Sequence, residues 1–274
     1  MTTETLTLRD TKLVLDDGIA TLSHERPAAR NALSMDMRQD YREALDRIEA
    51  DRSIRALVIT GSGGSFCAGG DLKSLKQRLA DPAEQAPDSM RRRIAGGHAW
   101  LFKRLQGLEI PVIAAVDGPA YGAGFSLALT ADFVLASSRA AFCMSFAKVG
   151  LVPDMGAFYL LPRAVGLPMA KELAFTARRV GVEEAKTLGI VHSIHAPEAL
   201  PEAAAAFARR FIDAPREAIA LSKQLFNRSY ESDYDTMAAM ESQAQAIAAA
   251  APYHGEAVAA FLSGQPAKFD WDRG

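Results

Sequence analysis

Two kinds of hydrophobic pattern alternate along the first sixty residues. Residues 12–24 (KLVLDDGIATLSH) hold two short apolar segments around Asp17 and Gly18, and an Asp-Gly pair in this position favours a tight hairpin turn. Residues 31–51 then place apolar side chains three and four positions apart, which indicates one buried face of a helix. The apolar run IRALVIT at residues 54–60 is typical of a buried strand. A hairpin, a helix and a strand are therefore predicted in this order.

The alternation of helix and strand continues through the middle of the chain. We expect a helix at residues 90–105, a strand at 111–116 (PVIAAV), an apolar helical stretch at 125–130 and another strand at 133–136. Because helices alternate with apolar, β-branched strands, the sequence predicts an α/β fold in which helices cover a mainly parallel sheet.

The last part of the chain has a different character. From Pro162 onward the sequence is rich in alanine and helical in pattern, with glycines and prolines as stops. We therefore divide the chain into a core domain, residues 1–195, and a C-terminal helical region, residues 196–274. Residues 80–90 (ADPAEQAPDSM) are polar and contain two prolines, so they are predicted to form a surface loop or a lid.

Composition narrows the class of protein without naming a function. A chain of 274 residues can bury one substantial core, and 49% hydrophobic and 23% charged residues with a net charge of −2 give no sign of a nucleic-acid-binding surface. No apolar run approaches the roughly 20 residues that span a bilayer. Cys67 and Cys143 are too few for a disulfide framework. We expect a cytoplasmic protein with neither a nucleic acid nor a membrane as partner.

The histidines do not form a metal site in the sequence. His192 and His195 have a spacing that suits a shared metal ion, but a third ligand is missing beside them. The other histidines are His24, His98 and His254. We therefore expect no metal.

Two glycine-rich segments follow predicted strands, FCAGGDL at residues 66–72 and GPAYGAG at residues 118–124. Glycine lets the main chain approach a ligand closely, and the first N–H groups of a helix point outward without partners, so such turns bind oxyanions or phosphates. Two amides that converge on one oxygen form an oxyanion hole. Tight packing between strand and helix explains the same glycines, so both interpretations stay open at this point.

The second glycine-rich segment also permits other sites. It lacks the third glycine of the dinucleotide-binding fingerprint, which argues against such a site. GFSLA at residues 124–128 is similar to the nucleophile elbow of serine hydrolases, with Ser126 as the nucleophile. An acid at Asp233 or Asp235 and a base at His254 would follow in the order of that class. A serine near the first turn of a helix explains Ser126 equally well.

Both segments resemble the glycine motifs of the crotonase family, also called the enoyl-CoA hydratase/isomerase family. FCAGGDL resembles the family's F-C-A-G-x-D-L signature, and VDGPAYGAG at residues 116–124 resembles its second motif. The resemblance continues in the family's order along nearly the whole chain, so that chance agreement is improbable. Further matching segments are RPAARNAL at residues 26–33, GLVPD at 150–154, residues 181–191 and the closing helix at 256–261.

The resemblance implies a fold of ββα units repeated in a spiral, assembled as trimers or dimers of trimers, with residues 196–274 taking part in oligomerisation and pocket closure. It implies an acyl-coenzyme A thioester as substrate, with coenzyme A as carrier and no permanently bound cofactor. The amides of Gly70 and Ala123 would form the oxyanion hole for the thioester carbonyl. The residues implied at coenzyme A are Arg26, Arg30, Ala68, Asp71, Leu72 and Lys73, and those implied in the acyl pocket are Tyr121, Ser126 and Phe146.

The carboxylates decide which reaction the resemblance favours. Family hydratases hold a water with two glutamates, and this chain has Ser126 and Phe146 at the matching positions, so efficient hydration is not expected. Asp154 instead matches the acid of members similar to Δ3,Δ2-enoyl-CoA isomerases and the phenylacetate-pathway isomerase. One carboxylate can move the α proton of a 3-enoyl thioester to the γ carbon while the oxyanion hole holds the dienolate.

Other interpretations of these residues remain. Asp154 precedes an apolar helical stretch, and without the resemblance the N-cap of that helix would be the preferred interpretation. Basic residues such as Arg26, Arg30 and Lys73 are often simply solvated. The alternatives to an isomerase are a hydratase with one carboxylate, a serine hydrolase that uses Ser126, and an acyl-CoA binder without catalysis.

Overall fold

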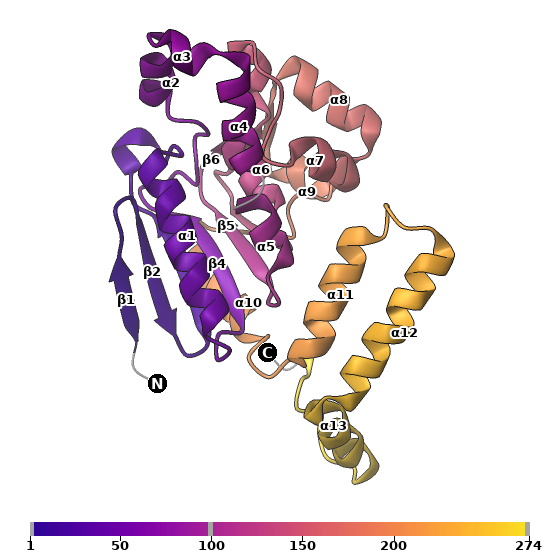
Figure 1. Ribbon diagram of the computed structural model, residues 1–274. Coiled ribbons are helices and arrows are strands. Elements are labelled where there is room, and N and C mark those ends of the chain that lie inside the picture. The colour runs from indigo at the N-terminus through magenta and orange to yellow at the C-terminus, as the bar shows by residue number, and fades with distance from the viewer. Residues whose placement is uncertain (1–2, 98–100, 272–274) are drawn as a thin grey trace.

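A seven-stranded sheet forms the centre of the computed structural model, which describes residues 3–97 and 101–271 (Figure 1). The order of its strands is β1-β2-β3-β4-β5-β7-β10. The strands β1 to β3 pair antiparallel, and the pairs from β3 to β10 are parallel. This confirms the predicted α/β class with a mainly parallel sheet. The bounds are β1 Glu4–Thr7, β2 Thr11–Asp16, β3 Ile19–His24, β4 Ala56–Gly61, β5 Val112–Val116, β7 Phe133–Ser137 and β10 Ser193–His195.

The hairpin predicted at Asp17 and Gly18 joins β2 to β3. Their φ angles are 43° and 77°, and positive φ at both central residues is what the favoured two-residue turn requires. The register pairs Asp16 with Ile19, which turns Leu13 toward the core. The turn chemistry therefore sets which face of these strands is buried.

A second, three-stranded sheet consists of β6 Pro119–Tyr121, β8 Ala141–Cys143 and β9 Arg179–Gly181, in the order β6-β8-β9. The sequence predicts a loop where β6 lies and helices where β9 lies. Strands of three residues are too short to show an alternating pattern, so periodicity cannot detect them.

The helices account for most of the remaining chain. Residues 98–100, which include His98 and part of the helix predicted at 90–105, lie outside the described residues. The helices are α1 Met35–Ala50, α2 Leu72–Leu79, α3 Pro82–Gln85, α4 Pro87–Gly97, α5 Lys103–Gly107, α6 Ala123–Leu129, α7 Ala157–Val165, α8 Leu167–Thr176, α9 Val182–Thr187, α10 Leu200–Arg209, α11 Arg216–Arg228, α12 Tyr234–Ala250 and α13 Pro252–Leu262.

The segment predicted as a loop at residues 80–90 is helical, because it forms α3 and the start of α4. The Asp81 side chain accepts a hydrogen bond from the Ala83 amide at 2.9 Å, and Pro82 occupies the first helical position. Asp as N-cap and Pro at the first position are strong helix starts. The prolines therefore begin helices here and do not interrupt them.

The two faces of the central sheet bury different residues of the same strand. Leu57 and Ile59 of β4 face the larger core, which includes α1. Ala56 and Val58 face a smaller core to which α10 contributes Phe207. This alternation follows from the two-residue period of a strand. Since α10 covers the sheet, the first helix after residue 195 is packed as part of the core.

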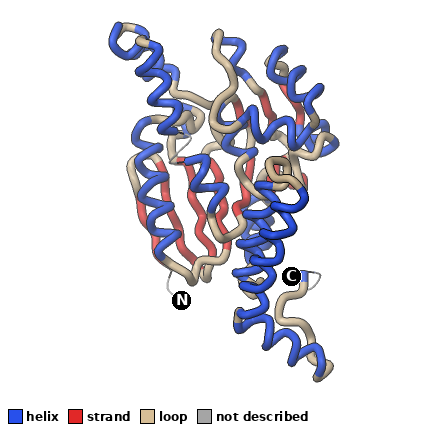
Figure 2. The backbone as a smooth tube through the Cα atoms, turned by 45° about the vertical axis from the view of Figure 1, so that its right-hand side comes forward, coloured by secondary structure: helices blue, strands red, loops and turns tan. Residues whose placement is uncertain are grey.

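The helices that follow α10 leave this core. Lys223 of α11 anchors it through a 2.7 Å ion pair with Asp132 and a 3.1 Å hydrogen bond to the Ile110 carbonyl oxygen. Helices α12 and α13 contain no buried residue and project from the rest of the molecule (Figures 1 and 2). They expose apolar side chains such as Phe261, 82% exposed. Their expected part in oligomerisation stays a prediction, which the molar mass in solution tests, and their expected part in pocket closure also stays a prediction.

None of the described helices is both long enough and apolar enough to cross a membrane.

Candidate active site

The two glycine-rich segments lie against each other. The Cys67 amide donates to the Pro119 carbonyl oxygen at 3.1 Å, and the Tyr121 amide donates to the Cys67 carbonyl oxygen at 2.9 Å. A Cβ atom at Gly124 would lie 2.1 Å from that carbonyl oxygen, so only glycine permits this approach. The packing role considered for these glycines is therefore present, and it brings both segments to one place.

The segment RPAARNAL at residues 26–33 holds the first glycine-rich segment from outside. Asn31 is buried, and its side-chain amide donates to the carbonyl oxygens of Ser62 and Ser65 at 2.9 and 2.6 Å. The Leu33 amide donates to the Gly69 carbonyl oxygen at 2.8 Å. Buried backbone carbonyls in a loop need such partners. Sequence reasoning assigned no role to Asn31, which fixes the loop.

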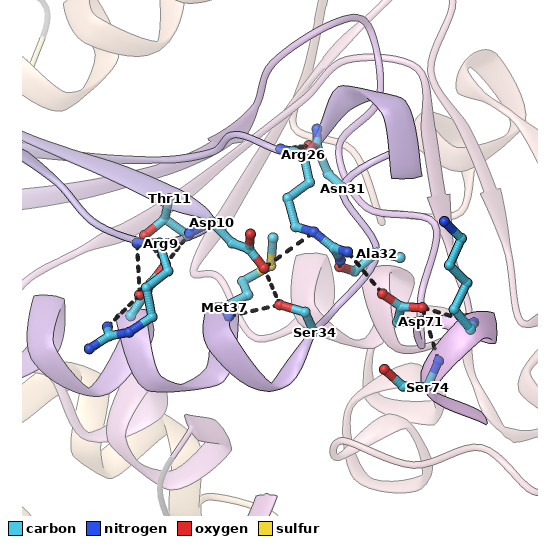
Figure 3. A network of polar contacts seen from close by, with 12 residues as sticks. Arg9, Asp10, Thr11, Arg26, Asn31, Ala32, Ser34, Met37, Asp71 and Ser74 are labelled. Atoms are coloured by element: carbon cyan, nitrogen blue, oxygen red, sulfur yellow. Dashed lines mark hydrogen bonds and ion pairs between the residues drawn. The ribbon is translucent and has the colours of Figure 1, made fainter. Parts of the chain in front are cut away.

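Arg26 fixes the same loop through charge (Figure 3). Its guanidinium lies 3.2 Å from the Asp10 carboxylate and 3.0 Å from the Asp71 carboxylate, and it donates to the Ala32 carbonyl oxygen at 2.8 Å. These groups engage three of the roughly five N–H donors of a guanidinium, and the contact of Arg26 with coenzyme A stays a prediction. We assign Arg26 a positioning role.

Asp71 has two structural tasks at the end of this loop. Its carboxylate forms an ion pair with Arg26. The same carboxylate caps α2 by accepting hydrogen bonds from the amides of Lys73 and Ser74 at 2.9 and 3.3 Å (Figure 3). Burial alone would raise the pKa of this carboxyl, but Arg26 and the two amides outweigh it and hold the pKa below its usual value. Asp71 thus stays ionised and engaged.

A cavity of about 330 Å³ opens beside both loops. Gly70, Ala123 and Asp154, the predicted catalytic residues, all line it, as does Phe146. Ala123 is the first residue of α6, so its N–H has no carbonyl one turn earlier to bind. The remaining predicted residues divide: Ala68, Asp71 and Leu72 line the cavity, whereas Arg26, Arg30, Lys73, Tyr121 and Ser126 do not.

Ser126 is neither a pocket residue nor a hydrolase nucleophile in this structure. It is completely buried within α6, and its hydroxyl donates to the Gly122 carbonyl oxygen at 3.3 Å. The proposed acid and base, Asp233 and His254, belong to the projecting α12 and α13 region, where Asp233 caps α12. A hydroxyl that no substrate can reach cannot attack an ester. The hydrolase alternative is therefore wrong.

Asp154 stands in the turn between a 3-10 helix, Ser145–Val149, and α7. The N-cap of α7 is Gly156, and no side chain caps it, so the capping interpretation of Asp154 is not supported. A Cβ atom at Gly156 would lie 2.1 Å from the Phe102 ring, and Gly156 has a φ of 84°. Glycine is therefore required in this turn. Asp154 precedes it, lines the cavity and has a buried Oδ1.

Asp154 also borders a second space. A second, apolar cavity of about 360 Å³ shares Asp154 and Ile94 with the first one, and Phe102 and Phe158 also line it. One carboxylate therefore faces both the glycine loops and an apolar compartment. This is a suitable position for an acid-base group acting on an acyl chain.

Two buried side chains, His24 and Tyr41, are hydrogen-bonded to each other, and His24 also contacts the first glycine-rich segment. His24 Nδ1 lies 2.9 Å from the Phe66 carbonyl oxygen, and its Nε2 lies 2.7 Å from the Tyr41 hydroxyl. Because a carbonyl only accepts, Nδ1 carries the proton in neutral His24, and Nε2 accepts from Tyr41. Burial lowers the pKa of His24 to about 4 and raises that of Tyr41 well above its ordinary value. Tyr41 lines the cavity.

We expect the buried His24 to make stability fall with pH. The unfolded chain protonates His24 near pH 6.5, but the folded chain does so only near pH 4. This contribution is therefore complete above pH 6.5, declines as pH falls and is gone below pH 4. Between pH 7.5 and pH 5 the free energy of unfolding should fall by about 2 kcal/mol more in the wild type than in His24→Asn. Urea unfolding at both pH values measures this, and equal pH dependence in the two proteins would contradict it.

Similarity to known proteins agrees with this site. The chain matches the model of the enoyl-CoA hydratase/isomerase family over residues 15–272. It is 36% identical over 255 residues to a 1,2-epoxyphenylacetyl-CoA isomerase of Escherichia coli (strain K12), covering 93% of this chain and 96% of that protein. It is also 36% identical over 227 residues to a short-chain-enoyl-CoA hydratase of Clostridium acetobutylicum, covering 82% and 84%.

A solved structure shows the same arrangement of the chain. The crystal structure of an enoyl-CoA hydratase/isomerase from Cupriavidus metallidurans CH34 superposes with a TM-score of 0.91 at 41% identity. The match covers 96% of this chain and 97% of that one. The predicted spiral fold of ββα units is thereby confirmed, because the likeness extends over both chains.

Proposed function

The chain belongs to the enoyl-CoA hydratase/isomerase family and processes acyl-CoA thioesters, and from this premise we propose that it moves the double bond of a 3-enoyl-CoA to position 2. The observation that carries the proposal is the set of carboxylates. Two acidic side chains, Asp71 and Asp154, line the cavity within the described part of the chain. Since Asp71 is engaged by Arg26 and caps α2, Asp154 is the acid-base candidate.

The proposed reaction needs no other carboxylate. The thioester carbonyl accepts hydrogen bonds from the amides of Gly70 and Ala123, which stabilise negative charge on its oxygen. Asp154 removes a proton from the α carbon, and the electron pair spreads over the carbonyl and the double bond as a dienolate. The same proton returns from Asp154 to the γ carbon, which leaves the double bond between the α and β carbons. Substrate and product are isomers, so atoms and electrons balance.

Hydration is less well supported, because this chain has no carboxylate at the two positions where family hydratases hold a water molecule. Family hydratases use two glutamates there, and this chain has Ser126, which is completely buried, and Phe146, whose side chain is apolar and lines the cavity. Neither can activate a water molecule as a base. The hydratase reaction of one relative is therefore an outcome for the experiment, and we do not adopt it as the proposal.

We also propose where coenzyme A lies. The loop residues Ala68, Gly69 and Leu72 line the cavity beside Gly70, so the pantetheine arm would run along this main chain. Arg30 and Lys73 have exposed side chains outside the cavity, where the phosphates of a carrier that leaves the pocket would pass.

A panel of thioesters tests the reaction type. We expect 3-enoyl-CoA thioesters to be converted to 2-enoyl-CoA, and 2-enoyl-CoA thioesters to take up water at a far lower rate. Absorbance of the conjugated product and mass spectrometry measure the two reactions separately. Efficient hydration without isomerisation would overturn the isomerase proposal, and binding without any turnover would favour the non-catalytic alternative.

A further inference from the structure

Three arginines from three helices line one part of the cavity. They are Arg38 of α1, Arg78 of α2 and Arg93 of α4. Helices α2 and α4 lie near the start of α1 at one end of the molecule (Figure 1). These positions are distant in sequence and match no motif, so sequence reasoning assigned them no role. We call them the arginine cluster.

The cluster gathers positive charge that the protein neutralises only in part. Burial and the neighbouring Arg78 lower the pKa of Arg38 against the opposite effect of Asp154. Burial and Arg93 lower the pKa of Arg78 against the opposite effects of Glu84 and Asp71. Within residues 3–97 and 101–271, neither Arg38 nor Arg78 forms an ion pair with an acidic side chain. Arg93 does so with Glu84 at 3.4 Å. The arginines therefore repel one another at the wall of a cavity.

Arg78 has one N–H donor that the described residues leave without a partner. Its Nε is buried and has no hydrogen-bond partner in the described part of the chain. A buried donor without a partner costs free energy, and one beside other cations costs more. A carboxylate or phosphate matches the planar guanidinium with two parallel hydrogen bonds and would neutralise the charge as well.

The position of the cluster distinguishes the acyl group from the carrier. Asp154 raises the pKa of Arg38, so this arginine of the cluster lies within electrostatic reach of the proposed proton shuttle. Arg78 and Arg93 also share the cavity wall with Leu75 and Ile94, which suit an alkyl chain. A group bound here therefore lies on the side of the reacting carbons.

We propose that Arg38, Arg78 and Arg93 form an anion subsite for a carboxylate at the far end of the acyl chain, so that the substrates are half-thioesters of dicarboxylic acids. This proposal rests on the proposed function, because it assumes that the thioester carbonyl lies at Gly70 and Ala123. It concerns the substrate class and leaves the proposed chemistry unchanged.

Binding of two saturated thioesters of equal length tests the subsite without turnover. We expect adipyl-CoA to bind at least about tenfold more tightly than hexanoyl-CoA, since hydrogen bonds to charged groups are worth one to two orders of magnitude in affinity. Arg78→Gln and, separately, Arg93→Gln should remove most of this preference. Isothermal titration calorimetry measures the six dissociation constants, two for each of the wild type and the two variants. Two variants are used because either one alone can fail to fold.

Arg91→Gln is the matched control, because Arg91 lies on α4 beside Arg93 but has a 71% exposed side chain that pairs with Asp88 at 2.8 Å. It should keep the preference of the wild type. Equal affinity of the wild type for the two thioesters would overturn the proposal. A preference that persists in both cavity variants would overturn it too.

Pantetheine thioesters separate an acyl carboxylate from the phosphates of coenzyme A. If adipyl-pantetheine keeps its advantage over hexanoyl-pantetheine and loses it in Arg78→Gln, the carboxylate is the ligand. If Arg78→Gln weakens adipyl-CoA and hexanoyl-CoA equally and leaves both pantetheine thioesters unchanged, the cluster binds phosphate and the proposal is wrong.

Turnover of 3-hexenoyl-CoA and 3-hexenedioyl-CoA separates the subsite from the proposed function. Isomerisation of both with equal kcat/KM, unaltered in ratio by Arg78→Gln, refutes the subsite and leaves the function intact. Arginine-dependent binding of adipyl-CoA without isomerisation of either substrate refutes the function and leaves the subsite intact.

Discussion

Replacing Asp154 with asparagine is expected to reduce the isomerisation of 3-enoyl-CoA by about a hundredfold to ten-thousandfold, the range of positioned acid-base groups. Asparagine has the shape of aspartate but cannot take the α proton. The loss should appear in kcat, because the substitution leaves unchanged the amides of Gly70 and Ala123 that we propose as the thioester contacts. Coupled absorbance assays at saturating substrate measure it.

Two further measurements make the Asp154→Asn result specific. Calorimetric binding of a saturated acyl-CoA should stay close to that of the wild type. Thermal unfolding should change little, because Gly156 is the N-cap of α7 and no side chain caps that helix. Asp36→Asn, an exposed carboxylate in the first turn of α1, is the control and should retain activity. Isomerisation by Asp154→Asn within a fewfold of the wild type would place the base at another residue.

Exchange of the α proton with deuterated water tests the same residue one step earlier. A saturated acyl-CoA cannot isomerise, but Asp154 can still remove and return its α proton. We expect this exchange in the wild type and not in Asp154→Asn. Exchange that persists in Asp154→Asn would show that another group removes the α proton, even if isomerisation were lost.

Local signals in the sequence predicted the scaffold well where the pattern was long enough. The hairpin at Asp17 and Gly18 follows from turn chemistry, helix α1 from apolar periodicity, and the parallel strands β4, β5 and β7 from short apolar runs. Strands β6, β9 and β10, of three residues each, have no period to detect. They exist because neighbouring strands pair with them, which is tertiary information.

The sequence predicted those residues of the site whose type and position suit only one role. Gly70, Ala123 and Asp154 were found from motifs, and the structure brings them to one cavity. Arg26 shows the limit, because a basic residue near a ligand loop fits a phosphate contact and a loop brace equally well. Only the distances to Asp10 and Asp71 favour the brace.

Residues that come together only in the folded structure could not be predicted from the sequence. Arg38, Arg78 and Arg93 belong to helices that the sequence does not relate to one another, and Arg78 lies just before residues predicted to form a loop. The same holds for His24 and Tyr41, whose hydrogen bond joins a strand to a helix. A cluster of charges or a buried hydrogen bond of this kind forms only when distant segments pack together, and the sequence pattern gives no signal for it.

The amide of Ala123 is expected to contribute as much as the carboxylate of Asp154, although no side chain is involved. Proline at position 123 removes the N–H, and loss of one oxyanion donor costs about a hundredfold to a thousandfold in kcat. Proline is tolerated at the first position of a helix, and Ala123 is the first residue of α6. Ala123→Pro therefore removes the donor at a position where the helix itself can continue.

Ala123→Gly is the matched control, because it keeps the N–H and changes only the small side chain. It should retain most of the activity, and circular dichroism and thermal unfolding should show both variants folded. The two substitutions share a position and differ in the donor, so the ratio of their kcat values isolates the hydrogen bond to the thioester oxygen. If folded Ala123→Pro turns over 3-enoyl-CoA as fast as Ala123→Gly, this amide does not bind the oxyanion. The dienolate would then require another donor at the cavity wall.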